Sequence, residues 1–241
     1  MADETKFFKI GLSVDNVIFG FDDGDLKVLL IERGEEPFIG KWALPGDLVY
    51  PTEGIESAAS RVLNELTGLE NVYLEQVKAF GAIDRHPIGR VITIAYYSLI
   101  KISSNQLKTS SFAKKAKWHS VNQVESLAFD HFKILKASYA MLKKSIRNRP
   151  VGFELLPPKF TLTQLQHLYE AVLEAELDKR NFRKKILSMG LLKDMNESQA
   201  GVAHRPAKLY SFDKEKYEML MSEGFVFELS DSKKLMGTTK Q

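Results

Sequence analysis

Residues 46–69, GDLVYPTEGIESAASRVLNELTGL, place acidic side chains and an arginine at spacings that could support metal chemistry. Arg61 and Glu65 lie four residues apart on a predicted helix, and Glu53 precedes that helix. Residues three or four apart share a helix face, where carboxylates can gather Mg²⁺ and the metal can activate water. One carboxylate on that face is a poor magnesium site, so an ion pair between Glu65 and Arg61 is the favoured interpretation. Glu53 could pair with Arg61 in the same way.

The composition is that of a globular protein with a sizeable core. The 241 residues are 44% hydrophobic and 27% charged, and this length suggests one large domain or two smaller ones. The sequence contains no cysteine, which excludes disulfides and thiolate metal sites. It has neither an apolar run of about 18 residues nor a signal-peptide pattern, so we expect a cytoplasmic protein with no membrane partner.

The first half of the chain alternates strand and helix patterns. Apolar, β-branched runs predict strands, and a DDGD turn joins the first two of them. A loop is expected at 34–46, and Gly68 should end a helix. Residues 90–100 are apolar on both faces, which predicts a central strand. The predicted strands cover 12–21, 26–33, 74–83, 90–100 and 113–121, and the helices cover 55–67 and a long segment from about Asp130.

The second half of the chain begins with a change in the residue pattern. Residues 147–160 hold three prolines and no regular period, which indicates a domain boundary. Thr161 and Gln164 form a capping-box signal for a following helix, and Gly190 should end a second one. Beyond it we expect two short strands joined by a polar turn at 196–201, a helix at 214–224 and a last strand at 225–229.

The order of turn, Glu53, Arg61, Glu65 and the Gly68-Leu69 pair resembles the Nudix family over roughly residues 10–145. The segments 42–46 and 129–131 also match positions typical of that family. The resemblance implies an α/β fold of the α+β Nudix sandwich type. In active members the catalytic sequence motif, called the Nudix box, carries a glycine where Asp47 stands here. It also carries acids where Val62 and Leu66 stand. We therefore expect no enzyme activity, no metal and no cofactor, with Val62 and Leu66 packed in the core.

The pocket over this helix is nevertheless expected to bind a hydroxylated or anionic effector. Charged residues of the box and of the loops that flank it in such folds are the candidates. For any single candidate, an ordinary charged residue at the protein surface is as good an interpretation as contact with the effector. The candidates are Arg33, Lys41, Asp47, Glu53, Arg61, Glu65, Asp84 and Arg90, and Arg85 and His86 lie on the same flanking loops.

Residues 177–190 indicate a DNA-reading helix. Five cations fall mainly on one side of this segment, with Phe182 and Ile186 on the other. An apolar helix, a basic helix and a two-stranded wing, in that order, form the winged-helix arrangement, whose second helix suits a major groove. Asn181 could read adenine or cap the helix. The candidate DNA-binding residues are Lys179, Arg180, Asn181, Arg183, Lys184, His204 and Arg205.

Together the two halves resemble the bacterial Nudix-related transcriptional regulators. That resemblance implies a homodimer that binds a near-palindromic double-stranded DNA operator and senses a small molecule, either ADP-ribose or a pentose such as L-arabinose. The absent acids favour a neutral sugar. The alternatives are a nucleoside diphosphate hydrolase with an accessory winged helix, and a structural adaptor without either activity. The expected domains are a Nudix-like domain at 1–148, a linker at 149–158, a winged-helix domain at 159–230 and a flexible tail at 231–241.

Overall fold

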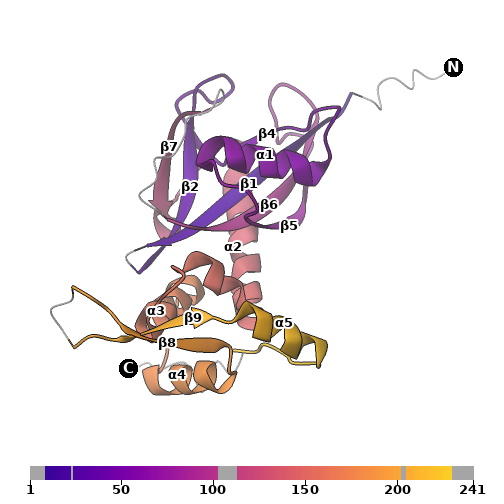
Figure 1. Ribbon diagram of the computed structural model, residues 1–241. Coiled ribbons are helices and arrows are strands. Elements are labelled where there is room, and N and C mark those ends of the chain that lie inside the picture. The colour runs from indigo at the N-terminus through magenta and orange to yellow at the C-terminus, as the bar shows by residue number, and fades with distance from the viewer. Residues whose placement is uncertain (1–8, 23, 103–112, 202–204, 230–241) are drawn as a thin grey trace, which may run out of the picture. The chain divides into compact units, whose positions relative to one another are not determined.

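The computed structural model describes residues 9–22, 24–102, 113–201 and 205–229 (Figure 1). The chain divides into two compact units, residues 1–20 with 27–141 and residues 21–26 with 142–241. The tail predicted at 231–241 lies outside the described residues. Within the described ranges, no helix is long and apolar enough to cross a membrane.

A seven-stranded sheet forms the centre of the first unit. Its strands span Gly11–Asp22 (β1), Asp25–Arg33 (β2), Trp42–Ala43 (β3), Gly46–Leu48 (β4), Tyr73–Phe80 (β5), Val91–Lys101 (β6) and Ala113–Ser120 (β7). The strand order is β3-β2-β1-β6-β5, with β4 also paired to β1 and β7 to β2. The strand predicted to be central, β6, indeed lies between two neighbours. The loop expected at 34–46 is partly wrong, because it contains β3 and the first residue of β4.

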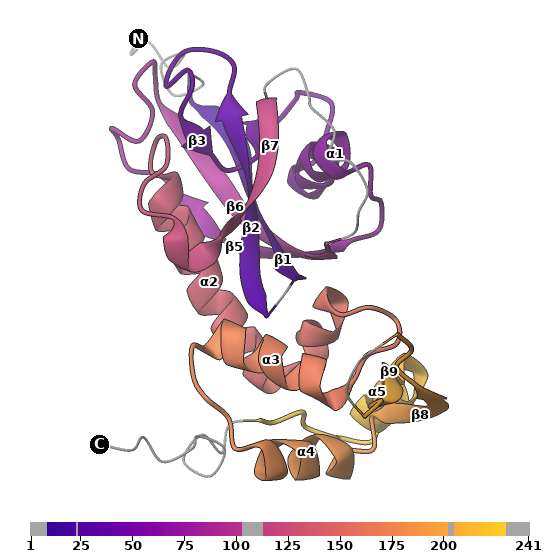
Figure 2. The same cartoon turned by 90° about the vertical axis from the view of Figure 1, so that its left-hand side faces the viewer.

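Helix α1, Ile55–Thr67, has the predicted bounds and buries one apolar face. Gly68 ends the helix with a φ of 68°, and its N–H donates to the carbonyl of Asn64 at 2.7 Å. Glycine adopts this left-handed conformation without a steric penalty. The first turns of α2, His131–Asn148, lie on the opposite side of the sheet from α1 (Figure 2). The buried residues of α1 are Ala58, Ala59, Val62, Leu63 and Leu66.

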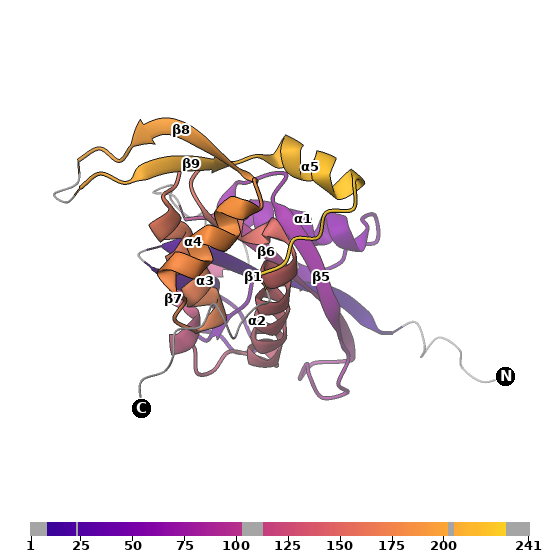
Figure 3. The ribbon, with the colours of Figure 1, turned by 90° about the horizontal axis from the view of Figure 1, so that it is seen from below.

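The second unit contains the predicted helix, basic helix and wing. Helix α3 spans Leu162–Leu173 and begins with the complete capping box of Thr161 and Gln164. It is followed by α4 (Lys179–Ser188), β8 (Leu192–Ser198), β9 (Lys208–Phe212) and α5 (Lys214–Ser222). The two strands pair antiparallel, and α5 follows β9 (Figure 3). The Tyr169 ring of α3 packs against the Phe182 ring of α4, with centroids 5.5 Å apart.

Three details of the second unit differ from the sequence prediction. Residues 147–160 are not irregular throughout, since Pro150–Leu155 forms the 3-10 helix η3, in which Val151, Phe153 and Leu155 are buried. The strand β8 extends into the turn predicted at 196–201 and ends at Ser198. Residues 225–229 form no strand. Phe227 is buried there, and the Leu229 N–H donates to the carbonyl of Arg147 at 2.9 Å.

Candidate functional site

Arg61 occupies the centre of the acidic residues that the sequence singled out. Its NH2 lies 2.8 Å from Oε1 of Glu53, and its NH1 lies 2.9 Å from Oδ2 of Asp47. The same NH1 lies 3.4 Å from Oε1 of Glu65. The hydrogen bond from Arg61 lowers the pKa of Glu53, and the Tyr50 N–H strengthens this effect. The predicted ion pairs are therefore present, and the carboxylates that could attract a cation are directed at a guanidinium.

Val62 and Leu66 lie in the core rather than at the surface where a metal would sit. Both are 0% exposed. Val62 packs with Val14 and Tyr96, and Leu66 packs with Ile31 and Ala43. The interpretation of these two residues as core packing is confirmed. Among the described residues, no group of three or more histidine and acidic side chains is arranged to hold a metal ion.

A second polar cluster is buried beside the Pro45-Gly46 turn. Arg85 NH2 lies 3.2 Å from Oδ2 of Asp15 and 2.8 Å from Oδ1 of Asp130, and all three side chains are almost inaccessible. Nδ1 of His131 accepts the Leu44 N–H at 3.0 Å, so the neutral ring carries its proton on Nε2. That Nε2 lies 3.4 Å from Oδ1 of Asp15. Burial lowers the pKa of His131, although the two carboxylates oppose that shift.

Gly46 is required for this cluster to assemble. A Cβ at this position would lie 2.1 Å from Oδ1 of Asp15 and 2.8 Å from the carbonyl of Val14. Atoms cannot approach so closely, and the nearer obstacle is held by its own ion pair with Arg85. The glycine therefore lets the loop that leads to α1 pass directly over Asp15.

Phe129 joins four other side chains from separate parts of the first unit. The His86 ring stacks on it with centroids 5.1 Å apart and an interplanar angle of 12°. Phe38 approaches edge-on at 4.7 Å, and the Arg33 guanidinium carbon lies 4.9 Å from the ring centroid. His131 lies 5.0 Å away on the side of the buried cluster. Phe129 thus connects two surface loops to the buried charges.

The predicted effector residues fall into two groups. Asp47, Glu53, Arg61 and Glu65 come together in the network described above. Of the others, Lys41 and Asp84 are exposed, and Arg33 contacts the Phe129 ring. Arg90 NH1 donates to the carbonyls of Gly81 and Ala82, both at 2.8 Å, and so shapes its own loop.

Sequence reasoning missed the cooperation of Asp15, Asp130 and His131 with Arg85. The available signal was Asp15 itself, an acid within a largely apolar predicted strand. A buried charge needs a charged or hydrogen-bonding partner, so such a residue predicts a cluster even where the partner is unknown. Phe38 was also missed, and the stacking of His86, a residue of the flanking loops, on Phe129 was not predicted.

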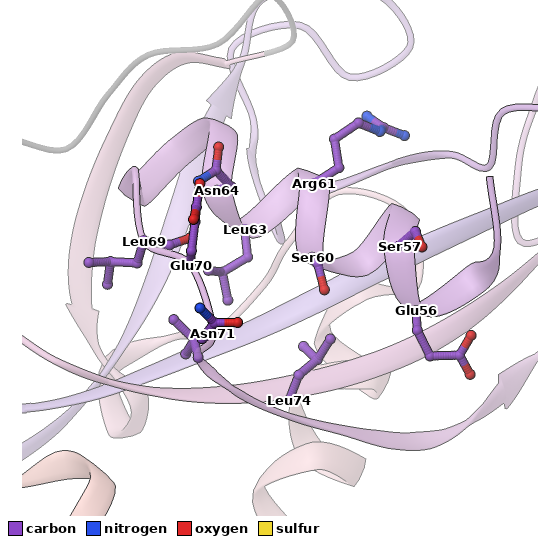
Figure 4. A pocket seen from close by; sticks show the side chains of 11 residues that line it. Glu56, Ser57, Ser60, Arg61, Leu63, Asn64, Leu69, Glu70, Asn71 and Leu74 are labelled. Atoms are coloured by element: carbon purple, nitrogen blue, oxygen red, sulfur yellow. The ribbon is translucent and has the colours of Figure 1, made fainter. Parts of the chain in front are cut away.

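A groove of about 790 Å³ lies beside α1 (Figure 4). Ser60 points from α1 toward the segment that carries Asn71 and Leu74, whereas Arg61 points away from Ser60 (Figure 4). Glu56 and Glu70 supply the two acidic groups of the groove. The lining comprises Glu56, Ser57, Ser60, Arg61, Leu63, Asn64, Leu69, Glu70, Asn71, Val72 and Leu74.

In the second unit, α4 presents an exposed basic surface. Phe182 and Ile186 are buried, whereas Lys179, Arg180, Asn181 and Lys184 are exposed. The helix cap is Asp178, whose side chain accepts the Asn181 N–H at 2.8 Å. The alternative that Asn181 caps the helix is therefore wrong, and this residue lies within the first turn.

Arg183 differs from the other predicted DNA-binding residues. Its NH2 donates to Oγ1 of Thr163 on α3 at 2.8 Å. Its Nε is buried without a hydrogen-bond partner among the described residues. Arg183 therefore holds α4 against α3. In the wing, Arg205 is exposed, and His204 lies outside the described residues.

Both units match known family models. Residues 9–138 match the NUDIX domain, and residues 152–212 match the NrtR DNA-binding winged helix domain. The chain is 35% identical over 211 residues to the ADPR responsive transcriptional repressor NtrR of Acinetobacter baylyi, covering 86% of this chain and 84% of that protein. It is also 35% identical over 133 residues to an ADP-ribose pyrophosphatase of Methanocaldococcus jannaschii, covering 55% of this chain and 78% of that enzyme.

Solved structures show the same combination of units. NrtR of Shewanella oneidensis in complex with a 27mer DNA is 30% identical, with a TM-score of 0.72, covering 83% of this chain and 93% of that one. The NUDIX domain of the same protein in complex with ADP ribose is 33% identical, with a TM-score of 0.52, covering 58% of this chain and 93% of that one. This chain therefore belongs to the NrtR family of Nudix-related transcriptional regulators, which join a Nudix domain to a DNA-binding winged helix.

Proposed function

We propose that the protein is a transcriptional repressor whose Nudix unit binds an ADP-ribose-like effector without hydrolysing it. The observation that carries this proposal is the arrangement around Arg61, where Asp47, Glu53 and Glu65 all contact one guanidinium. Hydrolysis in a Nudix box needs carboxylates that hold a metal, but here buried Val62 and Leu66 replace two of these acids, and the remaining ones contact a protein cation. The Nudix fold is retained, so this unit can keep a ligand-binding pocket without catalysing hydrolysis.

The effector class follows from the relatives rather than from the box. The Acinetobacter relative is named as responsive to ADPR, and a Shewanella Nudix domain was solved with ADP ribose. These similarities favour an ADP-ribose-like molecule. The expectation of a pentose such as L-arabinose finds no support among them. Absence of box acids does not by itself favour a neutral sugar, because cationic side chains can replace a metal in binding a diphosphate.

The DNA-binding role is proposed for α4 and the wing. The helix carries five cations and no acid over ten residues, and its exposed residues include Arg180 and Lys184. Such a surface supplies phosphate contacts, while Asn181 and Arg180 are suited to base edges in a major groove. A homodimer would present two such helices, which suits a near-palindromic operator. With DNA as the partner, we propose a cytoplasmic location.

Hydrolysis is the competing function, because one relative is an ADP-ribose pyrophosphatase.

The test of the repressor proposal is an affinity measurement on a fluorescent DNA duplex. The protein itself first enriches this duplex from a random-sequence pool. ADP-ribose, NAD, L-arabinose and D-ribose are then titrated in turn. We expect ADP-ribose to weaken DNA binding by about 5- to 150-fold, the usual range for coupled sites. A response to a pentose alone would reassign the effector. No enrichment of any duplex would overturn the repressor proposal.

A further inference from the structure

We infer that Gln166 and Glu170 of α3 determine the DNA specificity of the protein without contacting DNA, because they fix the direction in which α4 leaves the turn before it. The inference rests on the proposed function, in which α4 reads DNA. It deepens that function by naming the side chains that orient the reading helix. Both are positioning residues, since they act on DNA only through the exposed side chains of α4.

The two side chains hold a single residue of the turn, Leu177, at both of its backbone polar groups. Oε1 of Glu170 accepts the Leu177 N–H at 3.0 Å. Nε2 of Gln166 donates to the Leu177 carbonyl at 3.1 Å. The same Nε2 donates to Oε1 of Glu170 at 2.9 Å and so joins the two side chains. These three hydrogen bonds form the turn clamp.

Glu170 also fixes the start of the turn. Its backbone carbonyl accepts the N–H of Glu174 and, at 3.3 Å, the N–H of Ala175. Glu174 has a φ of 52°, a left-handed conformation that residues other than glycine rarely adopt and that persists only where the surroundings hold it. One residue of α3 therefore holds both ends of the turn, and a carboxylate makes stronger hydrogen bonds than a neutral acceptor.

The turn clamp lies directly before the cap of α4. The side chain of Asp178, the next residue, accepts the Asn181 N–H at 2.8 Å, and its carbonyl accepts the Phe182 N–H at 2.9 Å. A displacement of Leu177 therefore passes to the first turn of α4. This helix has 10 residues. At about 1.5 Å per residue, a rotation of about 10° at its start moves its far end by roughly 2.6 Å. Hydrogen bonds to base edges tolerate only about 0.5 Å.

Apolar packing alone defines that direction less well. The ring of Tyr169 packs against Phe182 of α4 with centroids 5.5 Å apart. Apolar contact is non-directional, and the buried Tyr169 hydroxyl has no hydrogen-bond partner among the residues that the structure describes. Directional contacts come from the turn clamp and from Arg183, whose NH2 donates to Thr163 at 2.8 Å. The turn clamp acts at the start of α4, where a change of direction has the largest effect.

A second acidic residue of the turn provides a matched control. Glu174 pairs with Lys143, and the two side chains are 45% and 27% exposed. Exposed ion pairs contribute little, because water and salt screen them. Gln166, by contrast, is 8% exposed, so water cannot readily replace the hydrogen bonds of the turn clamp. Glu174 thus shares its charge and its place in the chain with Glu170, but its side chain makes no part of the turn clamp.

The test compares the affinities of the full-length protein for two fluorescent duplexes of equal length, the enriched duplex and a scrambled version of it. Phosphate contacts serve both duplexes, whereas base contacts serve the enriched one. Glu170→Ala and Gln166→Ala each remove part of the turn clamp. We expect each to weaken binding of the enriched duplex by about 5- to 150-fold, as for the loss of one bidentate base contact. Affinity for the scrambled duplex, and its dependence on salt, should stay unchanged.

Two further variants separate positioning from folding. Glu170→Gln keeps an oxygen that can accept the Leu177 N–H, and it should restore most of the preference for the enriched duplex. Glu174→Gln removes a charge from the same turn and should leave both affinities unchanged. A residue needed only for folding would lower both affinities by the same factor, and thermal unfolding of each variant measures any loss of folded protein.

The outcomes distinguish this inference from the proposed function. If the wild type enriches a duplex and both alanine variants keep its full preference, the turn clamp does not determine specificity, while the repressor proposal stands. Equal losses on both duplexes would also overturn the inference, because they indicate a role in folding alone. If the wild type enriches no duplex, the proposed function falls and the inference falls with it.

Discussion

Arg61 donates two hydrogen bonds to Glu53, from Nε to Oε2 at 3.0 Å and from NH2 to Oε1 at 2.8 Å. This two-pronged contact uses both carboxylate oxygens, and the Arg61 guanidinium also stacks over the Tyr50 ring at 3.9 Å. The hydrogen bond raises the pKa of Arg61 and lowers that of Glu53, so both groups stay charged at neutral pH. A divalent cation would have to displace a fixed guanidinium to reach these oxygens.

The first prediction concerns hydrolysis. The purified protein with Mg²⁺ should turn over ADP-ribose far more slowly than the roughly 1–10³ per second of ordinary enzymes, because Arg61 engages the remaining acids. Release of AMP, followed by chromatography over hours, measures this rate. Metal-dependent turnover at an ordinary rate that disappears on Glu65→Gln would show that the box is still catalytic.

The second prediction concerns restoration of the box acids. Val62→Glu and Leu66→Glu each place a carboxylate at a position that is 0% exposed. An unpaired buried charge costs about 3–5 kcal/mol, so each variant should lose that much unfolding free energy in urea. Ser60→Glu, at an exposed position of the same helix, should change stability by no more than about 0.5 kcal/mol. A stable Val62→Glu, Leu66→Glu double variant with Mg²⁺-dependent hydrolysis would contradict this account of the core.

Local signals explain which parts of the fold could be predicted. Gly68 ends α1 and the pair Thr161 and Gln164 begins α3, because both signals act through hydrogen bonds within one turn. The basic helix α4 was recognisable from the spacing of its cations and of Phe182 and Ile186, although its cap is Asp178 and not Asn181. Residues 225–229 were wrongly predicted to form a strand because their side chains do alternate between buried and exposed, with Phe227 buried and Val226 exposed. A strand also needs a partner, which alternation cannot reveal.

The candidate site was only partly predictable. The contacts of Arg61 with Glu65 and Glu53 could be predicted from the sequence, because helix spacing and a short loop bring these residues together. Asp15 and Arg85 are separated by 70 positions, and only the pairing of strands places them in contact. The stacking of His86 on Phe129 likewise depends on where two loops end, and no period or spacing in one sequence encodes that.

The third prediction concerns DNA binding by α4. Arg180→Ala and Lys184→Ala should weaken binding to the selected duplex strongly, because both side chains are exposed on the basic helix. Lys143→Ala, a cation of α2 that pairs with Glu174, should matter less. If a dimer neutralises about six phosphates, the logarithm of affinity should fall against the logarithm of salt with a slope near −5. Affinities unchanged in both α4 variants would exclude this helix as the DNA contact.

The fourth prediction concerns pH and His131. Burial depresses the folded-state pKa of this ring below its ordinary value of 6.5. The positive charges of Arg85 and Arg33 lower the pKa further, whereas the negative charges of Asp15 and Asp130 raise it. The unfolded chain therefore binds more protons as pH falls through 6.5, and the free energy of unfolding should decrease with pH from there down to the folded-state pKa. Urea titrations at a series of pH values measure the slope.

His131→Gln is the matched variant for that slope. Its amide oxygen can accept the Leu44 N–H, but it cannot take up a proton. The dependence of stability on pH should become shallower, though not flat, because burial also lowers the pKa values of His86 and His119. An unchanged slope in His131→Gln would mean that this ring is not buried in its neutral form.

The central claim is that effector binding in the Nudix unit and DNA binding by the winged helix are coupled. Thermodynamic linkage requires each ligand to change the affinity of the other by the same factor. The most direct measurement is isothermal titration of the full-length protein with ADP-ribose, alone and saturated with the selected duplex. We predict that the duplex weakens ADP-ribose binding by about 5- to 150-fold, matching the loss of DNA affinity caused by ADP-ribose. A dissociation constant for ADP-ribose that is identical with and without the duplex would contradict the claim.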